Sequence, residues 1–520
     1  MSILFGQTTG ATPARMTKYM ECLGIALCIL CAVLSIAMTF QNRTLWPDEA
    51  MLVWNVETRT WSTLTASPLD MRQTAPALYL YCLKLASSVL GHAEWAYRLP
   101  AALAYAFLPL AIGWTARRLF RLSHPWLCAG FCANLKLLLV YSNQVKPYMG
   151  EAILVLLALA AFDCFLEGKL PWWGLAIAWV LSGLCGNPVW FAVAGCLGWA
   201  ALRSLLRRDS RVMLRCLAPG ALFGLCMAVY WVFWLAPVAH SSFMQGYWGD
   251  QTLSWPFSPS AILHDGKILW VHLATQVFGV RAFYICPLIV GSILFVAKAQ
   301  HRWGAITWLT LGCAGGASCL GMFPIGMRLW VFALPLVSLL AVWTLENLAG
   351  ARWMAPAGML LAAMALANMG IVRWNPTNNY LWGRELNDAM AYVEEHLRDG
   401  ESVYFPAEAF ARGQYKNGIG NRRMGHTSRD NVIFGEWLET DAARNGEVAR
   451  VESTGVCWLP MANRLDASFM EALAKSGTVE SKRVFQGTVT SFYRNNGNAL
   501  NGNGLSEAAA GGEGETGQTE

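Results

Sequence analysis

The chain has 520 residues and a formal net charge of +6; 55% of its residues are hydrophobic and only 14% are charged. Because soluble domains carry about 25% charged residues, this composition excludes an ordinary soluble domain and indicates an integral membrane protein. The basic residues cluster in short loops between apolar runs, so the positive charge gives no reason to expect a nucleic-acid partner.

Long apolar runs recur along the chain, and about eleven of them approach the roughly 20 residues that a membrane-spanning helix needs. The first run has no small-residue cleavage site after it, which indicates a signal anchor rather than a cleaved signal peptide. The candidate spans lie near residues 20–40, 97–116, 126–142, 147–166, 172–186, 188–206, 215–238, 282–299, 303–323, 328–347 and 353–372. The Gly-Asn-Pro run at 186–188 interrupts 172–206, which could therefore be one kinked element. The shorter run 268–280 is expected to be interfacial or re-entrant.

The Lys/Arg bias of the short loops predicts a cytoplasmic N-terminus, because cytoplasmic loops carry the excess of positive charge. Three basic loops then fall on the cytoplasmic side: 117–121, 203–215 and 298–302. The opposite, periplasmic side holds the long loops 41–96 and 239–281 and the region that follows the last span, 373–520.

The C-terminal region is expected to form a separate domain outside the membrane. Residues 373–494 include the amphipathic stretch "RELNDAMAYVEEHLRDG" and two strand-like stretches, "ESVYFPAEAF" and "RVFQGTVTSFYR", which together predict a small α+β domain. The Gly- and Asn-rich tail, 495–520, cannot build a packed core and is expected to be disordered.

Two adjacent carboxylates, Asp48 and Glu49, follow the first span in the stretch "TLWPDEAMLVWN". Pro47 favours the start of a helix, and carboxylates in a first turn are stabilised by the helix dipole, which is a purely structural explanation for the pair. Adjacent residues do not share a helix face, so one carboxylate could meet a substrate while the other holds a metal or a basic partner.

Cationic side chains are expected at the same membrane face as these carboxylates. Arg98, Lys146 and Arg328 each stand at the outer end of a predicted span, where they either snorkel to water or bind an anionic group such as a phosphate. Glu151 lies about one turn inside an apolar run, and it is expected either to form an ion pair within the helix bundle or to act in catalysis.

Four stretches in this order resemble the GT-C glycosyltransferases, specifically the family 39 group that contains protein O-mannosyltransferases and lipid A aminoarabinose transferases. They are "WPDEA" at 46–50, "APALYLYCLKL" at 75–85, "AEWAYRLPAAL" at 93–103 and "YSNQVKPY" at 141–148. The resemblance implies a polytopic helical fold with a polyprenyl-phosphate sugar as the donor. It also implies that the sugar is transferred with inversion at the outer membrane surface.

The resemblance also implies roles for individual residues. Asp48 would be the catalytic base, and Arg98, Lys146 and Arg328 would stabilise the departing phosphate, while Glu49 would complete the catalytic pair. Substrate-binding side chains are expected in the second and fourth stretches: Tyr79, Tyr81, Lys84, Gln144 and Tyr148.

The sequence departs from the family pattern at two positions. Gln73 stands where the family has a basic or imidazole residue before its prolines, and Arg72 is a candidate substitute for that positive charge. Gln144 replaces an acidic residue of the family. Both differences affect the expected contacts with the donor.

A divalent cation is a possible cofactor, with Mg²⁺ or Mn²⁺ favoured over Zn²⁺ because the expected ligands are oxygen atoms. Glu49 could hold it, and His240, His264 and Asp250 in the second outer loop could complete the site. The competing explanation is that each of these residues is an ordinary loop residue.

Together the sequence predicts a glycosyltransferase of the bacterial inner membrane that acts at the periplasmic face. Its expected partners are the lipid bilayer, a polyprenyl-phosphate-linked sugar and an envelope acceptor that is a protein, a lipid or a glycan. Two alternatives are a transporter or flippase of lipid-linked sugars, which predicts internal repeats with paired broken helices, and a non-catalytic membrane scaffold.

Overall fold

The computed structural model describes residues 14–40, 45–239, 301–349, 441–460, 467–485 and 488–496, with parts of 244–296 and 389–434. The predicted tail beyond residue 496 lies outside the described residues. The chain forms two compact units, one made of Met1–Arg43 and Met51–Pro376 and the other of Thr44–Ala50 and Thr377–Glu520.

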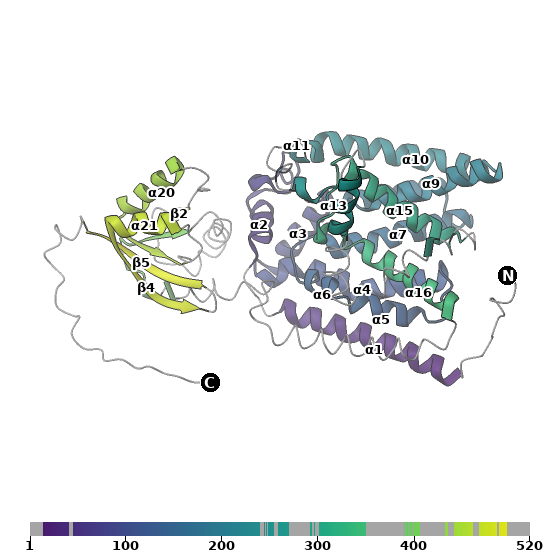
Figure 1. The fold of residues 1–520 in the computed structure, drawn as a ribbon, viewed down its shortest axis with the longest axis horizontal. Coiled ribbons are helices and arrows are strands. Elements are labelled where there is room, and N and C mark those ends of the chain that lie inside the picture. The colour runs from purple at the N-terminus through teal and green to yellow at the C-terminus, as the bar shows by residue number, and fades with distance from the viewer. Residues whose placement is uncertain are drawn as a thin grey trace. The chain divides into compact units, whose positions relative to one another are not determined.

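The first unit is helical, and its longer helices run side by side (Figure 1). Its elements are α1 (Ala14–Thr39), α2 (Pro47–Thr58, whose first turn belongs to the second unit), η2 (Asp70–Arg72), α3 (Ala77–Leu90), α4 (Glu94–Arg118), α5 (Pro125–Ala133), α6 (Lys136–Tyr141), α7 (Tyr148–Leu166), α8 (Trp172–Cys185), α9 (Val189–Arg207), α10 (Arg211–Tyr230), η3 (Trp231–Leu235), α11 (Ala236–Ala239), η4 (Gly249–Gln251), α13 (Pro259–Leu269), α15 (Arg302–Cys319), η7 (Met327–Trp330) and α16 (Ala333–Ala349).

Several of these helices can cross a membrane, which confirms the predicted class of helical membrane protein. By length and composition five candidates stand out among the described residues: Thr17–Thr39, Glu94–Arg118, Tyr148–Leu166, Val189–Arg207 and Arg211–Ala239. The expected count of about eleven stays a prediction, because the candidates 282–299 and 353–372 lie almost entirely outside the described residues.

Two sequence expectations about the spans need correction or refinement. The expected span 126–142 is not continuous, since α5 ends at Ala133 and α6 begins at Lys136, and Asn134 instead accepts a 3.4 Å hydrogen bond from Cys31. The Gly-Asn-Pro run at 186–188 separates two distinct helices, α8 and α9, because Pro188 and Gly186 both disfavour a continuous helix there.

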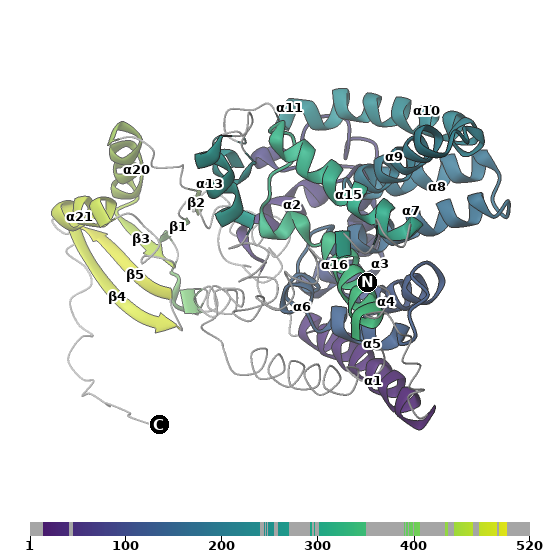
Figure 2. The ribbon, with the colours of Figure 1, turned by 45° about the vertical axis from the view of Figure 1, so that its right-hand side comes forward.

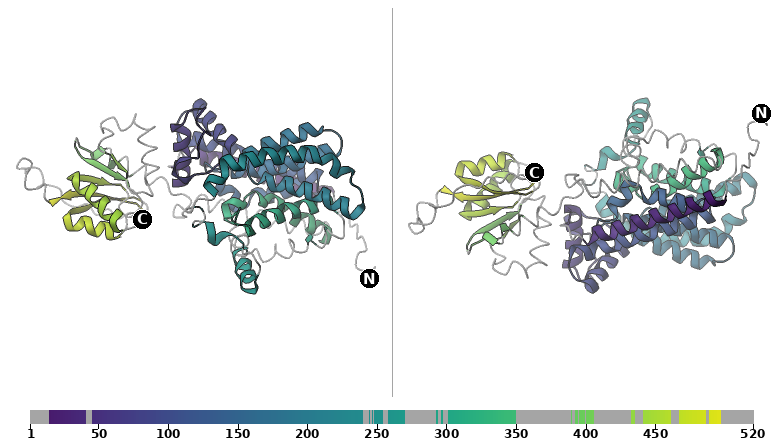
Figure 3. Two further views of the ribbon diagram at one scale, coloured as in Figure 1. Left: turned by 90° about the horizontal axis from the view of Figure 1, so that it is seen from above. Right: turned by 90° about the horizontal axis from the view of Figure 1, so that it is seen from below.

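Small residues let the helices approach closely. A Cβ atom on Gly24 of α1 would lie 2.3 Å from the carbonyl oxygen of Trp126, and one on Gly130 of α5 would lie 2.9 Å from the carbonyl oxygen of Gly24. Close backbone contact of this kind is a common source of helix association in membranes. It explains why α1 lies along α5 (Figure 1). The view from below shows α1 running along the surface of the helical unit (Figure 3).

A buried carboxylate fixes the relative direction of α4 and α7. Asp163 near the end of α7 is 3.2 Å from Arg118 at the end of α4, and it is also 3.0 Å from Arg302 at the start of α15. Because the C-terminal ends of α4 and α7 meet, the two helices run parallel. Their N-terminal ends, which carry Arg98 and Glu151, therefore lie together at the other end of the unit.

The second unit contains a mixed sheet with strand order β2-β1-β3-β5-β4 (Figure 2). Its elements are β1 (Ser402–Phe405), β2 (Val432–Phe434), α20 (Asp441–Ser453), β3 (Val456–Leu459), α21 (Ala467–Ser476), β4 (Gly477–Phe485) and β5 (Thr488–Asn495). β1 pairs in parallel with β2 and β3, whereas β5 pairs antiparallel with β3 and β4. The second predicted strand, "RVFQGTVTSFYR", is therefore a hairpin rather than one strand.

Alternating side chains divide this sheet into two apolar faces, as the period of two in a β-strand requires. Tyr404 and Cys457 pack against α20 and α21, while Phe405 and Trp458 pack on the opposite face with Phe492.

Candidate active site

The turn before α7 contacts the segment that leads into α3. Lys146 is 8% exposed, and its Nζ donates a 3.2 Å hydrogen bond to Oε1 of Gln73. The amide nitrogen of Gln73 in turn lies 3.3 Å from the sulfur of Met51 and 3.5 Å from the carbonyl oxygen of Met71. Gln73, whose own position is fixed, is therefore one of the groups that hold the buried ammonium.

The same segment is anchored at its other end by the end of α10. Trp234 donates a 3.0 Å hydrogen bond to the carbonyl oxygen of Ala75, and the backbone N–H of Ala77 donates to the hydroxyl of Tyr230 across 3.2 Å. Neither aromatic residue was picked out from the sequence. Their position at the end of a predicted span, where aromatic residues gather, is the signal that could have identified them.

Arg98 is the fifth residue of α4 and is only 3% exposed, which does not fit a side chain that snorkels to water. Glu94, four residues earlier on the same helix, is 5% exposed. Residues four apart lie on one helix face, so the cation and the carboxylate are neighbours there.

Glu151 is also buried, in the first turn of α7. The backbone N–H of Asn187 donates to its carboxyl group, and a Cβ atom on Gly186 would lie 2.9 Å from its Cγ. Within the described part of the chain no Lys, Arg or His lies within ion-pair distance of Glu151, so the ion pair considered from the sequence is not found there. The break between α8 and α9 provides the contacts instead.

Three residues from separate elements form a cluster that the sequence did not reveal. The hydroxyl of Tyr97 donates a 2.5 Å hydrogen bond to Glu57, and Nδ1 of His92 lies 2.9 Å from the same carboxylate. The carboxylate of Glu57 and the Tyr97 ring are buried, whereas the imidazole of His92 is exposed. A carboxylate that orients an exposed imidazole in this way is chemically able to support proton transfer.

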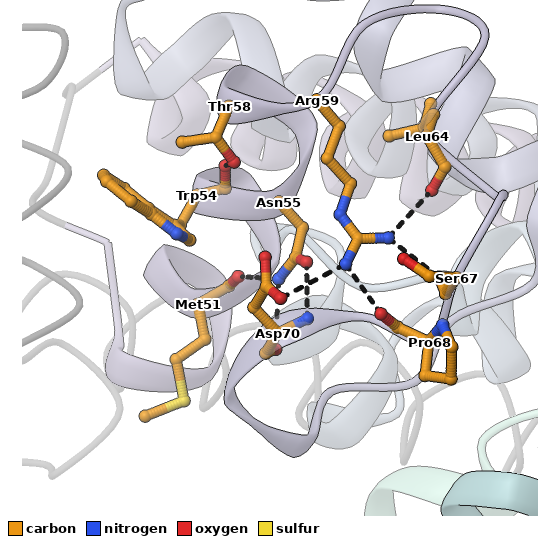
Figure 4. Close-up of polar contacts among 9 residues, drawn as sticks. All are labelled: Met51, Trp54, Asn55, Thr58, Arg59, Leu64, Ser67, Pro68 and Asp70. Atoms are coloured by element: carbon orange, nitrogen blue, oxygen red, sulfur yellow. Dashed lines mark hydrogen bonds and ion pairs between the residues drawn. The ribbon is translucent and has the colours of Figure 1, made fainter.

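The loop between α2 and η2 is held by side chains rather than by regular structure (Figure 4). Arg59 donates to the carbonyl oxygens of Ser67 at 2.8 Å and Pro68 at 2.6 Å, and its guanidinium lies 3.3 Å from the carboxylate of Asp70. Asn55 accepts from the backbone N–H of Asp70 at 2.7 Å. These contacts fix the start of the segment that carries Gln73.

Two of the predicted substrate-binding residues make contacts within the outer loop. Tyr81 shares a 3.0 Å hydrogen bond with Thr65 and stacks on Trp61, and Lys84 donates a 2.7 Å hydrogen bond to the carbonyl oxygen of Val56 at the end of α2.

The remaining members of the predicted substrate set are Tyr79, Tyr148 and Gln144. Tyr79 and Tyr148 are buried, and the ring of Tyr148 packs edge-on against Tyr141. The carbonyl oxygen of Gln144 accepts a 2.8 Å hydrogen bond from the backbone N–H of Lys146, which shapes the turn before α7.

The adjacent acidic residues occupy different environments in the segment Thr44–Ala50. Glu49 is 2% exposed, and its carboxylate accepts a 2.7 Å hydrogen bond from the backbone N–H of Trp46. This contact is half of a capping box, in which the third residue of a helix reaches back to the residue before it. Asp48 is partly exposed and does not share this capping contact. Glu49 therefore has a structural role in starting α2.

The other predicted site residues make different contacts, or have side chains outside the described residues. Arg328 lies on η7, and its guanidinium is 5.0 Å from the ring centre of Trp248. His264 is exposed and pairs only loosely with the neighbouring Asp265 across 3.4 Å. The residue His240 and the side chains of Arg72 and Asp250 lie outside the described residues.

A metal site is not formed by the residues that the structure describes. No group of three His, Cys, Asp or Glu side chains among them could hold a metal ion. Glu49 and His264 are not part of such a group among these residues.

Comparisons with solved structures identify the class of fold. ArnT from Cupriavidus metallidurans in the apo state has a TM-score of 0.53 at 12% identity, with 89% of this chain and 97% of that chain covered. The Archaeoglobus fulgidus oligosaccharyltransferase in complex with Zn and sulfate has a TM-score of 0.51 at 12% identity, with 90% and 73% covered. ArnT from Cupriavidus metallidurans bound to undecaprenyl phosphate has a TM-score of 0.48 at 14% identity, with 90% and 97% covered.

The expected resemblance to GT-C glycosyltransferases, among them a lipid A aminoarabinose transferase, is thereby confirmed at the level of the fold. No protein-family model matches the sequence, and no curated protein matches it. At 12% identity, the roles of individual residues in these structures cannot be transferred to this chain. The chemistry is therefore argued from the side chains of this chain.

Proposed function

We propose that the chain is a membrane glycosyltransferase that moves a sugar from a polyprenyl-phosphate donor to an envelope acceptor. The supporting observation is that two buried cations, Arg98 and Lys146, and two buried carboxylates, Glu94 and Glu151, stand at the shared N-terminal ends of α4 and α7. Buried charges of both signs are costly in a membrane unit, and they are expected where a charged substrate binds.

Arg98 and Lys146 would stabilise the phosphate that departs from the sugar. A guanidinium binds phosphate oxygens in a bidentate manner, and an ammonium adds a compact positive charge. Because both side chains are withdrawn from water, their attraction to the charge that develops on the phosphate is stronger than it would be at an exposed surface. Arg328 and Arg72 remain proposed contacts to the same group.

Asp48 would be the base that accepts the proton of the acceptor hydroxyl as that hydroxyl attacks the anomeric carbon. Its neighbour Glu49 is committed to capping α2, so the two adjacent carboxylates would divide their tasks. The attack would come from the face opposite the departing phosphate, which gives inversion.

The active site and the C-terminal unit would lie in the periplasm of a bacterium, with the N-terminus in the cytoplasm. This orientation is supported by the concentration of arginines at the opposite end of the helical unit, where Arg118 and Arg302 meet Asp163. The prenyl chain of the donor would lie against the apolar helices.

Purified protein in proteoliposomes, supplied with a panel of radiolabelled undecaprenyl-phosphate sugars and an extract of envelope acceptors, tests the proposal. The expected result is that the labelled sugar of one donor is transferred to an acceptor, which is either a non-lipid molecule or a lipid of the lipid A type. Undecaprenyl phosphate should accumulate at the same time. If label instead crosses the bilayer while still attached to its lipid, the protein is a flippase and the proposal is wrong. If no donor is either consumed or moved, a scaffold is favoured.

A further inference from the structure

The turn between α9 and α10 is unusually rich in arginine. The stretch "RSLLRRDSRVMLR" (203–215) contains five arginines and one acidic residue, Asp209. α9 ends at Arg207, Arg208 adopts a left-handed backbone with φ of 50°, and α10 begins at Arg211. This left-handed residue ends α9 and turns the chain tightly into α10.

Arg203 and Arg215 are committed to contacts within the protein. Arg203 lies 2.9 Å from Asp209, and Arg215 donates a 3.0 Å hydrogen bond to the carbonyl oxygen of Phe165 while its guanidinium lies over that ring. The carboxylate of Asp209 also accepts a 3.3 Å hydrogen bond from the backbone N–H of Arg211. It is therefore already engaged by two donors.

The side chains of the other arginines face outward. Arg207, Arg208 and Arg211 are all exposed, and within the described part of the chain neither Arg208 nor Arg211 forms an ion pair. We call Arg208 and Arg211 the arginine patch.

Another basic loop at the same end of the unit differs sharply. There Arg118 pairs with Asp163 and Glu167, and Lys169 pairs with Glu167 across 2.8 Å. Carboxylates of the protein thus pair with Arg118 and Lys169. The arginine patch is left for a partner from outside the chain.

Exposed leucines show what surrounds the patch. Leu205, Leu206 and Leu214 are 78%, 74% and 61% exposed, directly beside the arginines. In a chain that spans a membrane, such leucines are covered by acyl chains and adjacent arginines extend to the headgroups. The patch therefore stands at the depth of the phosphates.

We propose that the arginine patch is a binding site for the phosphate of an anionic phospholipid in the leaflet that faces this end of the helical unit. The planar guanidinium suits bidentate contact with phosphate oxygens, and clusters of basic residues beside a membrane span attract anionic lipids. The proposal is independent of the enzymatic function, because the patch lies at the end of α9, far along the helix from the break at 186–188.

Native mass spectrometry of the full chain in detergent, titrated with phosphatidylglycerol or phosphatidylcholine, tests this site. We expect the affinity for phosphatidylglycerol to fall about fivefold for each arginine removed, and therefore roughly 25-fold in R208Q/R211Q. The charge-retaining variant R208K/R211K should keep most of the binding. The matched control K169Q removes the same charge from the same end of the unit, but from a lysine already paired with Glu167, and should change the affinity less than twofold.

Three outcomes would overturn the proposal. Equal retention of phosphatidylcholine would mean that the leucines alone bind lipid. An equal loss in K169Q would mean that net charge rather than the patch is responsible. Retention of undecaprenyl phosphate, but not of phosphatidylglycerol, would assign the site to the prenyl lipid.

Discussion

Lys146 and Gln73 form a direct hydrogen bond of 3.2 Å between an ammonium and an amide oxygen, joining the turn before α7 to the segment that leads into α3. The resemblance to family 39 places a basic or imidazole residue at position 73, where this chain has a neutral one. The positive charge that meets Gln73 therefore comes from Lys146, in the turn before α7.

This relationship predicts that the charge can be exchanged between the two positions. K146Q should weaken undecaprenyl-phosphate binding by about 10- to 100-fold, because a hydrogen bond to a charged group is lost. The double variant Q73K/K146Q should recover much of that affinity, since the ammonium returns to the opposite side of the same contact. Binding of undecaprenyl phosphate by native mass spectrometry, with Q73K alone as the control, measures both effects.

Suppose that the double variant is folded, as its melting temperature would show, but binds undecaprenyl phosphate no better than K146Q. The prediction that the charge can be exchanged between positions 73 and 146 would then be wrong. If wild type itself failed to bind undecaprenyl phosphate, the donor assignment rather than the exchange would be wrong.

The capping contact of Glu49 predicts a difference between two substitutions. E49A removes the acceptor for the backbone N–H of Trp46 and should lower the free energy of unfolding by about 1 kcal/mol, as the loss of a helix cap does. E49Q keeps an acceptor oxygen and should remain close to wild type in stability. Thermal unfolding in detergent compares them, and equal destabilisation by both would contradict the capping role.

Gly186 and Glu151 are predicted to be coupled. G186A places a methyl group 2.9 Å from the Cγ of Glu151 and should destabilise the protein by about 1–3 kcal/mol through overpacking. Shortening the acid in G186A/E151A should relieve part of that cost, so that the double variant is more stable than the sum of the single effects. Strict additivity in a double-mutant cycle of melting temperatures would disprove the contact.

His301 provides a pH-dependent prediction. Its Nδ1 accepts the backbone N–H of Gly304 at 3.0 Å, and burial, with repulsion from Arg302 and Arg121, lowers its pKa to about 4. Because the ordinary pKa is about 6.5, the unfolded chain binds a proton between these values and the folded chain does not. This contribution to stability is present above about pH 6.5 and is lost as the pH falls towards 4.

The measurement is the melting temperature of wild type and H301N between pH 7 and about pH 4, since asparagine retains a cap acceptor. Acidification should lower the wild-type melting temperature more than that of the variant. Parallel curves for the two proteins would contradict the role of His301.

Sequence reasoning found the features that local chemistry encodes. Apolar length marked the spans around α1, α4 and α7, and Pro47 marked the start of α2. It also selected Arg98 and Lys146, because a cation at the end of an apolar run is unusual wherever the chain folds.

The rest depends on contacts between distant segments. Glu57, His92 and Tyr97 come from α2, a short loop and α4, and nothing in their spacing links them. The ion pair that the sequence offered as one explanation of Glu151 is not found among the described residues. Its contacts there come from a helix break found only after α8 and α9 are placed.

Transfer of labelled sugar by wild type and D48N, with the undecaprenyl-phosphate donor that the wild type consumes, tests the central claim most directly. The substitution keeps the shape of the side chain and removes its ability to accept a proton. The account predicts that D48N remains folded and loses about 10²- to 10⁴-fold in turnover. Equal turnover by the two proteins would remove Asp48 from the reaction and contradict the proposed mechanism.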